Sequence, residues 1–294
     1  MAASESKKNV RLPEELSEGE QKATASRKEE IKKKIKEEIK KVLTKDGILF
    51  DEAKIPNIAI LGSGGGLRAM IALYGTLAQL KKCGLLDCVM YLCGVSGSTW
   101  CMSALYKNED WAKNIEDFAT LPRKIFTSNS WELTKAIDAL RECVEDECYS
   151  LTDFWAYFVV YMMLKELHES TLSDQQKACE NGKNPYPIYA AVDKHTYYEE
   201  HKACSWFEFT PHEVGVLSRH DHPGNGAYIA TENFGSKFNK GKMVEKKKER
   251  NISFLQGLWG SALGSGKKIM EIVKALTDFL TVKTAILRQA AAEA

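Results

Sequence analysis

Two glycine-rich turns, each between a short apolar run and a helix-like run, constrain this chain more than any other feature. The first lies in NIAILGSGGGLRAM, which starts at residue 57, and the second lies in VMYLCGVSGSTW, which starts at residue 89. Strands that alternate with helices in this way are typical of an α/β fold with a largely parallel central sheet flanked by helices. Because ligands bind at the carboxyl ends of parallel strands, we expect both turns to open on the same edge of the sheet.

The second turn presents Ser96 between Gly94 and Gly97. A sharp strand-to-helix elbow exposes one hydroxyl, and the glycines leave room for the tight backbone and for a reacting group. The sequence departs from the G-x-S-x-G pattern because position 98 is a serine. The turn predicts a nucleophilic Ser96, with an ordinary small-residue loop as the alternative.

The first turn carries Gly64, Gly65 and Gly66 in a row. Consecutive glycines before a helix leave backbone N–H groups unshielded at the positive end of the helix dipole, where an anion or oxyanion binds. Leu67 occupies the position of the third glycine of the dinucleotide-binding fingerprint, and no Gly-Lys pair follows as in a nucleotide-binding loop. We therefore predict an oxyanion site, with a tight turn that holds no ligand as the alternative.

Charge and cysteine content bear on the partners and on the cellular compartment. The chain has 41 Lys and Arg against 40 Asp and Glu, a net charge of +1 that argues against a protein that coats nucleic acid. Its eight cysteines form no C-x2-C pair, so we expect free thiols and no metal site. The sequence has no apolar signal core, no run of about 18 apolar residues and no lipidation motif. These features predict a cytosolic protein.

Along the chain, residues 1–50 form a charged, partly helical segment ahead of the α/β region, residues 51–294. Within the charged segment, residues 26–43 predict a helix because apolar side chains recur at helical spacing, at Ile31, Ile35, Ile39 and Val42. We expect this helix to pack by one narrow apolar edge. Its lysine-rich face also suits an anionic membrane surface, which we hold as the secondary reading.

Two later segments have the composition of lipid contacts. Residues 237–250 are basic, which fits either anionic head groups or an ordinary surface loop, through Lys237, Lys240, Lys242, Lys246, Lys247, Lys248 and Arg250. Residues 266–292 predict a long amphipathic helix. Between the elbow and these segments, TPHE at 210–213 predicts a helix start. Thr210 would be the N-cap, and Glu213 would bond back to it as in a capping box.

The two turns, GSGGGLRA and GVSGSTW, together resemble the cytosolic phospholipase A2 family (group IV). Further matches are SLTDFWAY, YPIYAAV, WFEFTPHEVG, NFGSKF and GLWGSA, so that the resemblance covers residues 57 to about 265. The sequence is most similar to the gamma type of the family, which lacks a C2 domain. The resemblance implies a patatin-like α/β catalytic domain and a phospholipase A2 that releases fatty acid and lysophospholipid, with lysophospholipase activity as a further expectation.

The resemblance also implies roles for individual residues. Ser96 is expected to be the nucleophile, Gly65 and Gly66 the oxyanion donors, and Arg68 the group that binds the substrate phosphate. It implies no cofactor and no metal, membrane phospholipids as the partner, and a cytosolic protein that associates peripherally with intracellular membranes. No protein partner is inferred.

The family uses a Ser-Asp dyad, and its aspartate is the one role that the sequence does not supply. The family places that aspartate in a downstream turn of the Asp-Gly type, and no such turn follows Ser96. We therefore expect the front part of a catalytic domain: a fragment, a short splice form or an incomplete paralogue. His212, His220 and His222 are the weaker candidates for a base. The alternative function is a catalytically incomplete lipid-binding or regulatory protein.

Overall fold

A computed structural model describes residues 9–12, 15–43, 55–128, 130–144, 147, 149–192, 206–216, 226–260, 271 and 274. Most of the helices lie before residue 183, and most of the strands lie after it. They are α1 (Glu18–Leu43), β1 (Ile58–Gly62), α2 (Gly66–Lys82), η2 (Leu86–Cys88), β2 (Val89–Val95), α3 (Gly97–Leu105), η3 (Ile115–Thr120), α4 (Leu121–Thr127), α5 (Leu133–Val144), α6 (Leu151–Phe154), η4 (Trp155–Val160), α7 (Tyr161–Leu164), η5 (Ser173–Gln175), α8 (Gln176–Cys179), η6 (Glu180–Gly182), β3 (Tyr186–Val192), β4 (Trp206–Phe209), β5 (Glu213–Val216), β6 (Ala227–Ala230), η7 (Thr231–Asn233), β7 (Lys237–Asn239), β8 (Lys242–Glu245) and α10 (Ile252–Trp259).

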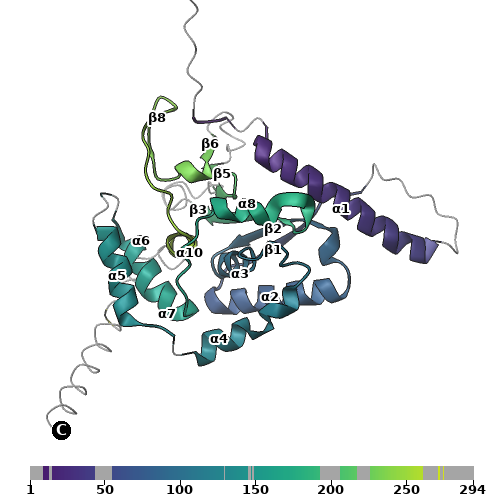
Figure 1. The fold of residues 1–294 in the computed structure, drawn as a ribbon, viewed down its shortest axis with the longest axis horizontal. Helices are drawn as coiled ribbons and strands as arrows, with labels where there is room; N and C mark the ends of the chain where they lie inside the picture. Colours follow the sequence, from purple (N-terminus) through teal and green to yellow (C-terminus); the bar gives the residue numbers. More distant parts are fainter. Residues whose placement is uncertain are drawn as a thin grey trace, which may run out of the picture.

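A six-stranded sheet in the order β1-β2-β3-β4-β5-β6 forms the centre of the fold (Figure 1). The first three strands are parallel, and β4, β5 and β6 each join their neighbour antiparallel. In the parallel part, Gly94 of β2 lies between Gly62 of β1 and Tyr189 of β3. The α/β class is therefore confirmed: the sheet is mixed, and both predicted turns follow strands of its parallel half.

Alternate residues of the central strands face two different helical layers. Leu92 of β2 and Tyr189 of β3 belong to the main apolar core, together with Met70 of α2 and Trp100 of α3. The alternate positions of the same strands point to the opposite layer. There Tyr186 of β3 packs in a smaller cluster with Ala23 of α1. The period of two along a strand explains this division.

Helix α1 confirms the predicted N-terminal helix and begins eight residues earlier, at Glu18. Its apolar edge includes Ile31, which is buried in a cluster with Ile55 and Met90. The exposed face carries i,i+3 ion pairs such as Lys32 with Glu29 at 2.6 Å. Whether residues 1–50 form a separate unit stays a prediction, although α1 packs along β2, η2 and η6.

Arg27 fixes this helix to the rest of the molecule. The residue is 3% exposed, and its guanidinium donates to backbone carbonyls, including Val89 O at 2.9 Å, Gly182 O at 2.9 Å and Leu86 O at 3.0 Å. Burial lowers the pKa of this guanidinium. A single buried cation thereby ties α1 to two distant segments of the backbone.

A helical layer formed by α5, α6, η4, α7 and α10 lies beside the sheet (Figure 1). The six residues of η4 have π-helical hydrogen bonding and are all buried. Helix α10 packs closely on η4, because a Cβ built on Gly257 would lie 2.5 Å from the Cβ of Ala156. This contact supports α10 where it touches α3.

Two expectations about local structure change. Residues 210–213 are a tight turn between β4 and β5 and not a helix start: Thr210 N donates to Glu213 O at 2.9 Å, and Glu213 N donates to Thr210 Oγ1 at 3.0 Å. The Thr210 hydroxyl does bond to the residue three positions later, as in a helix cap. Here it closes the turn between two strands, because β4 and β5 flank it. The predicted helix 266–292 lies outside the described residues, apart from residues 271 and 274.

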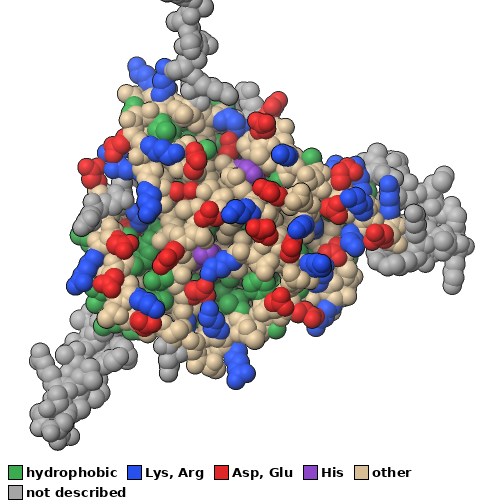
Figure 2. All heavy atoms as spheres, viewed as in Figure 1, with side chains coloured by type: hydrophobic (Ala, Val, Ile, Leu, Met, Phe, Trp, Pro, Cys, Tyr) green, Lys and Arg blue, Asp and Glu red, His purple; other side chains and the backbone are tan. Residues whose placement is uncertain are grey.

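The basic segment 237–250 is largely a β-hairpin, β7–β8, and not a uniformly positive surface. Four of its seven cations are ion-paired with carboxylates, namely Lys237, Lys246, Lys247 and Arg250. Acidic and basic side chains are also interspersed over the face shown in Figure 2. Contact of this segment with anionic head groups stays a prediction. None of the helices in the described part of the chain is long and apolar enough to cross a bilayer.

Candidate active site

Ser96 lies at the carboxyl end of β2, where the chain turns directly into α3. Its backbone has φ 52° and ψ −127°, a conformation that residues with a side chain rarely adopt. The residue is 5% exposed and stands at the N-terminal cap of α3. A strained serine between a strand and a helix has the backbone geometry of a nucleophile elbow.

The glycine at position 97 is required by the neighbouring loop. A Cβ built on Gly97 would lie 1.8 Å from the carbonyl oxygen of Gly66, which is far inside van der Waals contact. The backbone of the elbow therefore touches the backbone of the first glycine-rich turn. This contact explains why a small-residue turn occurs at both places in the sequence.

The first turn lies beside the serine. A Cβ built on Gly64 would lie 3.3 Å from Ser96 Cβ and 3.9 Å from Ser96 Oγ. Ser98 Oγ donates to Ser63 O at 2.6 Å and joins the two turns through a side chain. The sequence-based expectation that the turns face one another is confirmed by these distances.

Gly65 and Gly66 adopt the positive φ values of 135° and 61° at the start of α2. Such angles favour glycine and turn the backbone sharply into the helix. Helices α2 and α3 thus begin within contact of each other, and helix N-termini stabilise negative charge. The arrangement can hold an oxyanion, although the assignment of Gly65 and Gly66 as its donors stays a prediction.

Arg68 lies in the first turn of α2 and is exposed. It follows the glycine loop by two residues, so its Cα belongs to the same helix end. An exposed guanidinium at a rim can reach a phosphate with two parallel hydrogen bonds. Its predicted role in phosphate binding is compatible with this location and stays a prediction.

Helix α3 is held rigidly behind the serine. Thr99 N donates to Ser96 O at 2.9 Å, and Thr99 Oγ1 donates to the same oxygen. Further along the helix, Trp100 Nε1 donates to Gln256 O at 2.9 Å, and Gln256 Nε2 donates to Ser103 Oγ at 2.9 Å. The sequence indicates the GLWGSA motif but not that Gln256, the residue before it, supports the elbow, because Gln256 and Ser103 are 153 residues apart.

Among the candidate bases named from the sequence, His212 is the one that the structure describes. His212 Nδ1 lies 2.8 Å from the Tyr186 hydroxyl at the amino end of β3, beside Tyr91 of β2. Five residues separate Tyr91 from Ser96, roughly 16 Å along the strand. His212 therefore lies toward the opposite edge of the sheet, which argues against its role as the base, and His220 and His222 lie outside the described residues.

Asp153 is the most deeply buried aspartate among the described residues, and its partners are structural. It is 0% exposed, accepts a hydrogen bond from Ser150 N at 2.9 Å and forms an ion pair with Arg250. These contacts make it the second half of a capping box at α6. We assign neither Asp153 nor any other described residue to the dyad.

Among the described cysteines, Cys83, Cys93, Cys101 and Cys179 are free thiols, and burial raises the pKa of Cys101 to about 12. Within the described part of the chain, no group of three or more His, Cys, Asp or Glu is placed to hold a metal ion.

Comparison with known proteins extends this description. The family of lysophospholipase catalytic domains matches residues 58–277. Cytosolic phospholipase A2 gamma of Homo sapiens is 46% identical over 236 residues, which cover 79% of this chain and 42% of that protein. Cytosolic phospholipase A2 zeta of Homo sapiens is 38% identical over 265 residues, which cover 87% of this chain and 30% of that protein.

Solved structures give the same result for the fold. Human GIVD cytosolic phospholipase A2 superimposes with a TM-score of 0.73 at 31% identity, over 87% of this chain and 34% of that chain. The same human protein in complex with methyl gamma-linolenyl fluorophosphonate superimposes with a TM-score of 0.72 at 32% identity, over 86% of this chain and 36% of that chain. The chain thus spans about two fifths or less of the length of these relatives.

Proposed function

This chain belongs to the cytosolic phospholipase A2 family, whose lysophospholipase catalytic domain its residues 58–277 match, and from that membership we propose that it hydrolyses the acyl ester of glycerophospholipids through Ser96. The observation that carries the proposal is the elbow: a buried serine with φ 52° and ψ −127°, in contact with a glycine loop at a helix start. A hydroxyl held in this way is positioned for attack on a carbonyl carbon.

The reaction would proceed in two balanced steps. Ser96 Oγ attacks the ester carbonyl and gives its proton to a base, and the carbonyl oxygen becomes an oxyanion beside the backbone N–H groups at the start of α2. The intermediate collapses, the acyl group stays on Ser96, and the lysophospholipid leaves after its alkoxide takes the proton. Water then attacks the acyl-serine, which releases the fatty acid and restores the hydroxyl.

The substrate class follows from the groups around the elbow. Arg68 would bind the phosphate, and Leu61, 79% exposed just ahead of the glycine loop, would contact acyl chains or the bilayer surface. A relative that binds a fluorophosphonate with a linolenyl chain supports an acyl-chain substrate here. We further propose a cytosolic protein that associates peripherally with phospholipid membranes, in keeping with the names of its relatives.

Covalent labelling tests the nucleophile directly. A lipid-like fluorophosphonate reacts at phosphorus with an activated serine hydroxyl and loses fluoride, so mass spectrometry should place one adduct on Ser96. Ser96→Ala should abolish the adduct, whereas Ser130→Ala, at an exposed serine outside α3, should keep it. Equal labelling of the chain and of Ser96→Ala would remove Ser96 from this role.

A further inference from the structure

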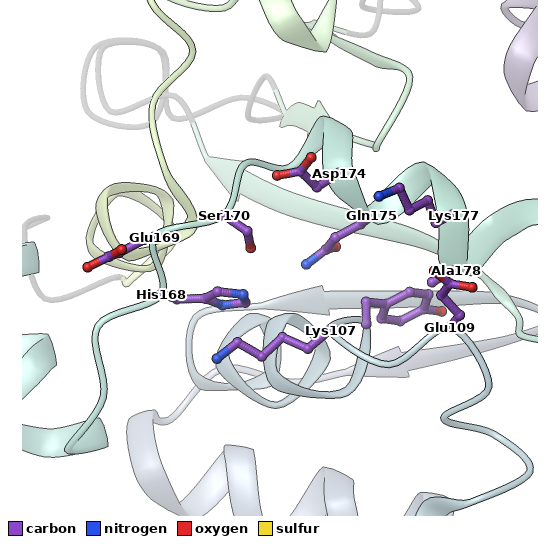
Figure 3. A pocket seen from close by; sticks show the side chains of 10 residues that line it. Lys107, Glu109, His168, Glu169, Ser170, Asp174, Gln175, Lys177 and Ala178 are labelled. Carbon is purple, nitrogen blue, oxygen red and sulfur yellow. The ribbon is translucent and has the colours of Figure 1, made fainter.

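A polar pocket of about 510 Å³ lies away from the elbow (Figure 3). It opens where the end of α3, the segment after α7 and the start of α8 come together, and Lys107, His168 and Gln175 are among its lining residues. Ser96 stands at one end of α3 and Lys107 just beyond the other, and the nine residues of α3 span about 13 Å. The pocket is therefore distinct from the candidate active site.

The walls of the pocket are fixed by hydrogen bonds to other elements. His168 N donates to Ser253 Oγ at 2.6 Å, and Ile252 N donates to Ser170 O at 2.8 Å, which ties this segment to the start of α10. Across the pocket, Gln175 Oε1 accepts a hydrogen bond from the Tyr189 hydroxyl at 2.6 Å. The pocket is thus preformed, as small-molecule sites usually are.

Two buried polar residues line the pocket, and one of them has an unpaired donor. Gln175 is 3% exposed, and among the described residues its Nε2 has no hydrogen-bond partner. His168 is 4% exposed and is among the residues that line the pocket. Figure 3 shows the His168 ring and the Gln175 amide pointing toward each other across the pocket. Buried polar groups are almost always paired, so this arrangement points to a bound molecule.

The electrostatics of the pocket favour a neutral molecule. Burial, and then the charge of Lys107, lowers the pKa of His168 to about 3, so the ring is neutral and offers one donor and one acceptor. The Lys107 ammonium is itself ion-paired with Glu166, which also pairs with Lys124 at 2.8 Å. Glu109, Glu169 and Asp174 oppose Lys107 and Lys177 in the lining. No excess of positive charge is present to attract an anion.

We propose that this pocket binds a neutral, hydroxyl-rich molecule of the polyol or sugar class. Each hydroxyl both donates and accepts, which complements a donor at Gln175 Nε2, the mixed capacity of the neutral His168 ring and the hydroxyl of Ser170. The volume is within the range of small-molecule sites. The proposal stands independently of the hydrolase function.

Ligand-observed NMR and thermal unfolding of the whole chain test the proposal, with myo-inositol, glucose and inorganic phosphate as probes. We expect saturation transfer to at least one polyol and a concentration-dependent rise of its midpoint of unfolding. Phosphatidylcholine vesicles with and without galactosyl diacylglycerol ask whether a lipid-borne sugar also binds. Binding of either form supports the polyol chemistry, and the comparison tells which source is recognised.

Three variants give the contrast. Gln175→Met removes the unpartnered donor at similar volume and should weaken polyol binding about tenfold or more. Ser170→Ala, at an exposed edge, should weaken binding without affecting the core, and it serves if Gln175→Met does not fold. Glu142→Gln, at an exposed position of α5 that does not line the pocket, should change nothing. No polyol binding, preferential phosphate binding, or unchanged affinity in both Gln175→Met and Ser170→Ala would overturn the proposal.

Discussion

The elbow at Ser96 and the contact of α1 with the sheet both join segments that are distant in the sequence, but they do so through different groups. At the elbow, backbone meets backbone so closely that Gly97 would place a Cβ 1.8 Å from Gly66 O. At the α1 contact, a long charged side chain, Arg27, spans the gap and donates to the carbonyls of distant segments. The elbow depends on glycines, which have no side chain, and the α1 contact depends on arginine, which has one of the longest side chains.

This difference predicts different responses to mutation. A crowded backbone tolerates no added atom but has no charge to lose, so pH should hardly affect it. The α1 contact contains buried ionisable groups, so it should respond to loss of charge and to pH. Four measurements, from the largest expected effect to the smallest, can break or sharpen this contrast.

Removal of Arg27 should have the largest effect. Arg27→Met leaves several buried carbonyl oxygens without donors, and since one such group costs about 1–3 kcal/mol, we expect a loss of about 3–5 kcal/mol in the free energy of unfolding. Urea denaturation followed by circular dichroism measures it. Arg123→Met, at an exposed arginine of α4, should stay within about 0.5 kcal/mol of the parent. A loss below about 1 kcal/mol in Arg27→Met would mean that α1 contributes little to the fold.

Gly97→Ala should damage the elbow and the chemistry together. The new methyl group meets the carbonyl oxygen of Gly66, which is backbone and cannot rotate away, so the two turns must separate at a cost of about 3 kcal/mol. Fluorophosphonate labelling of Ser96 should fall at least tenfold, because a tenfold rate change corresponds to only about 1.4 kcal/mol of transition-state stabilisation. Full labelling of a stably folded Gly97→Ala protein would show that the close approach of the turns is not needed for reactivity.

These two regions also show what the sequence could reveal. The turns were predictable because a run of glycines after an apolar strand has few structural meanings, and the facing of the turns followed from parallel strand order. The partners of Arg27 were not predictable, because they are backbone atoms 59 to 156 residues away that carry no sequence signal. The same reason hid the support from Gln256 and the pocket at Gln175, whose groups come together only in the folded chain.

The acidic group on α1 should make this contact weaken as pH rises. Glu20 is 9% exposed, and burial, followed by the charges of Glu208 and Glu213, raises its pKa to about 7, while Arg11 opposes the shift. A raised carboxyl pKa means that the folded state holds the proton more tightly, so its contribution is fully present below the unfolded pKa near 4.5 and is lost as pH rises through about 7.

Glu20→Gln mimics the protonated carboxyl and should remove this loss. We expect the variant to match the parent near pH 4.5 and to be more stable by about 3 kcal/mol at pH 8, since the pKa rises from 4.5 to about 7 and each pKa unit is worth about 1.4 kcal/mol. Thermal unfolding across this pH range measures the difference, and Glu18→Gln, at an exposed position in the same helix turn, is the control. A constant difference between parent and Glu20→Gln at all pH values would place the stabilisation in packing and not in the proton.

The smallest effect is expected at a glycine with open space around it, and there substitution should raise the free energy of unfolding. Gly75 lies in the middle of α2, and a Cβ built there would meet nothing within 4 Å. Alanine restricts the unfolded chain more than glycine and favours helix, so Gly75→Ala should raise the free energy of unfolding by about 0.4–1 kcal/mol. Labelling of Ser96 should stay unchanged, because the substitution lies about two turns beyond the glycine loop at the start of the same helix.

If Gly75→Ala destabilised the protein as Gly97→Ala is expected to do, the sensitivity would belong to glycine-to-alanine changes in this layer generally. The claim that crowding at Gly66 sets the elbow apart would then be wrong.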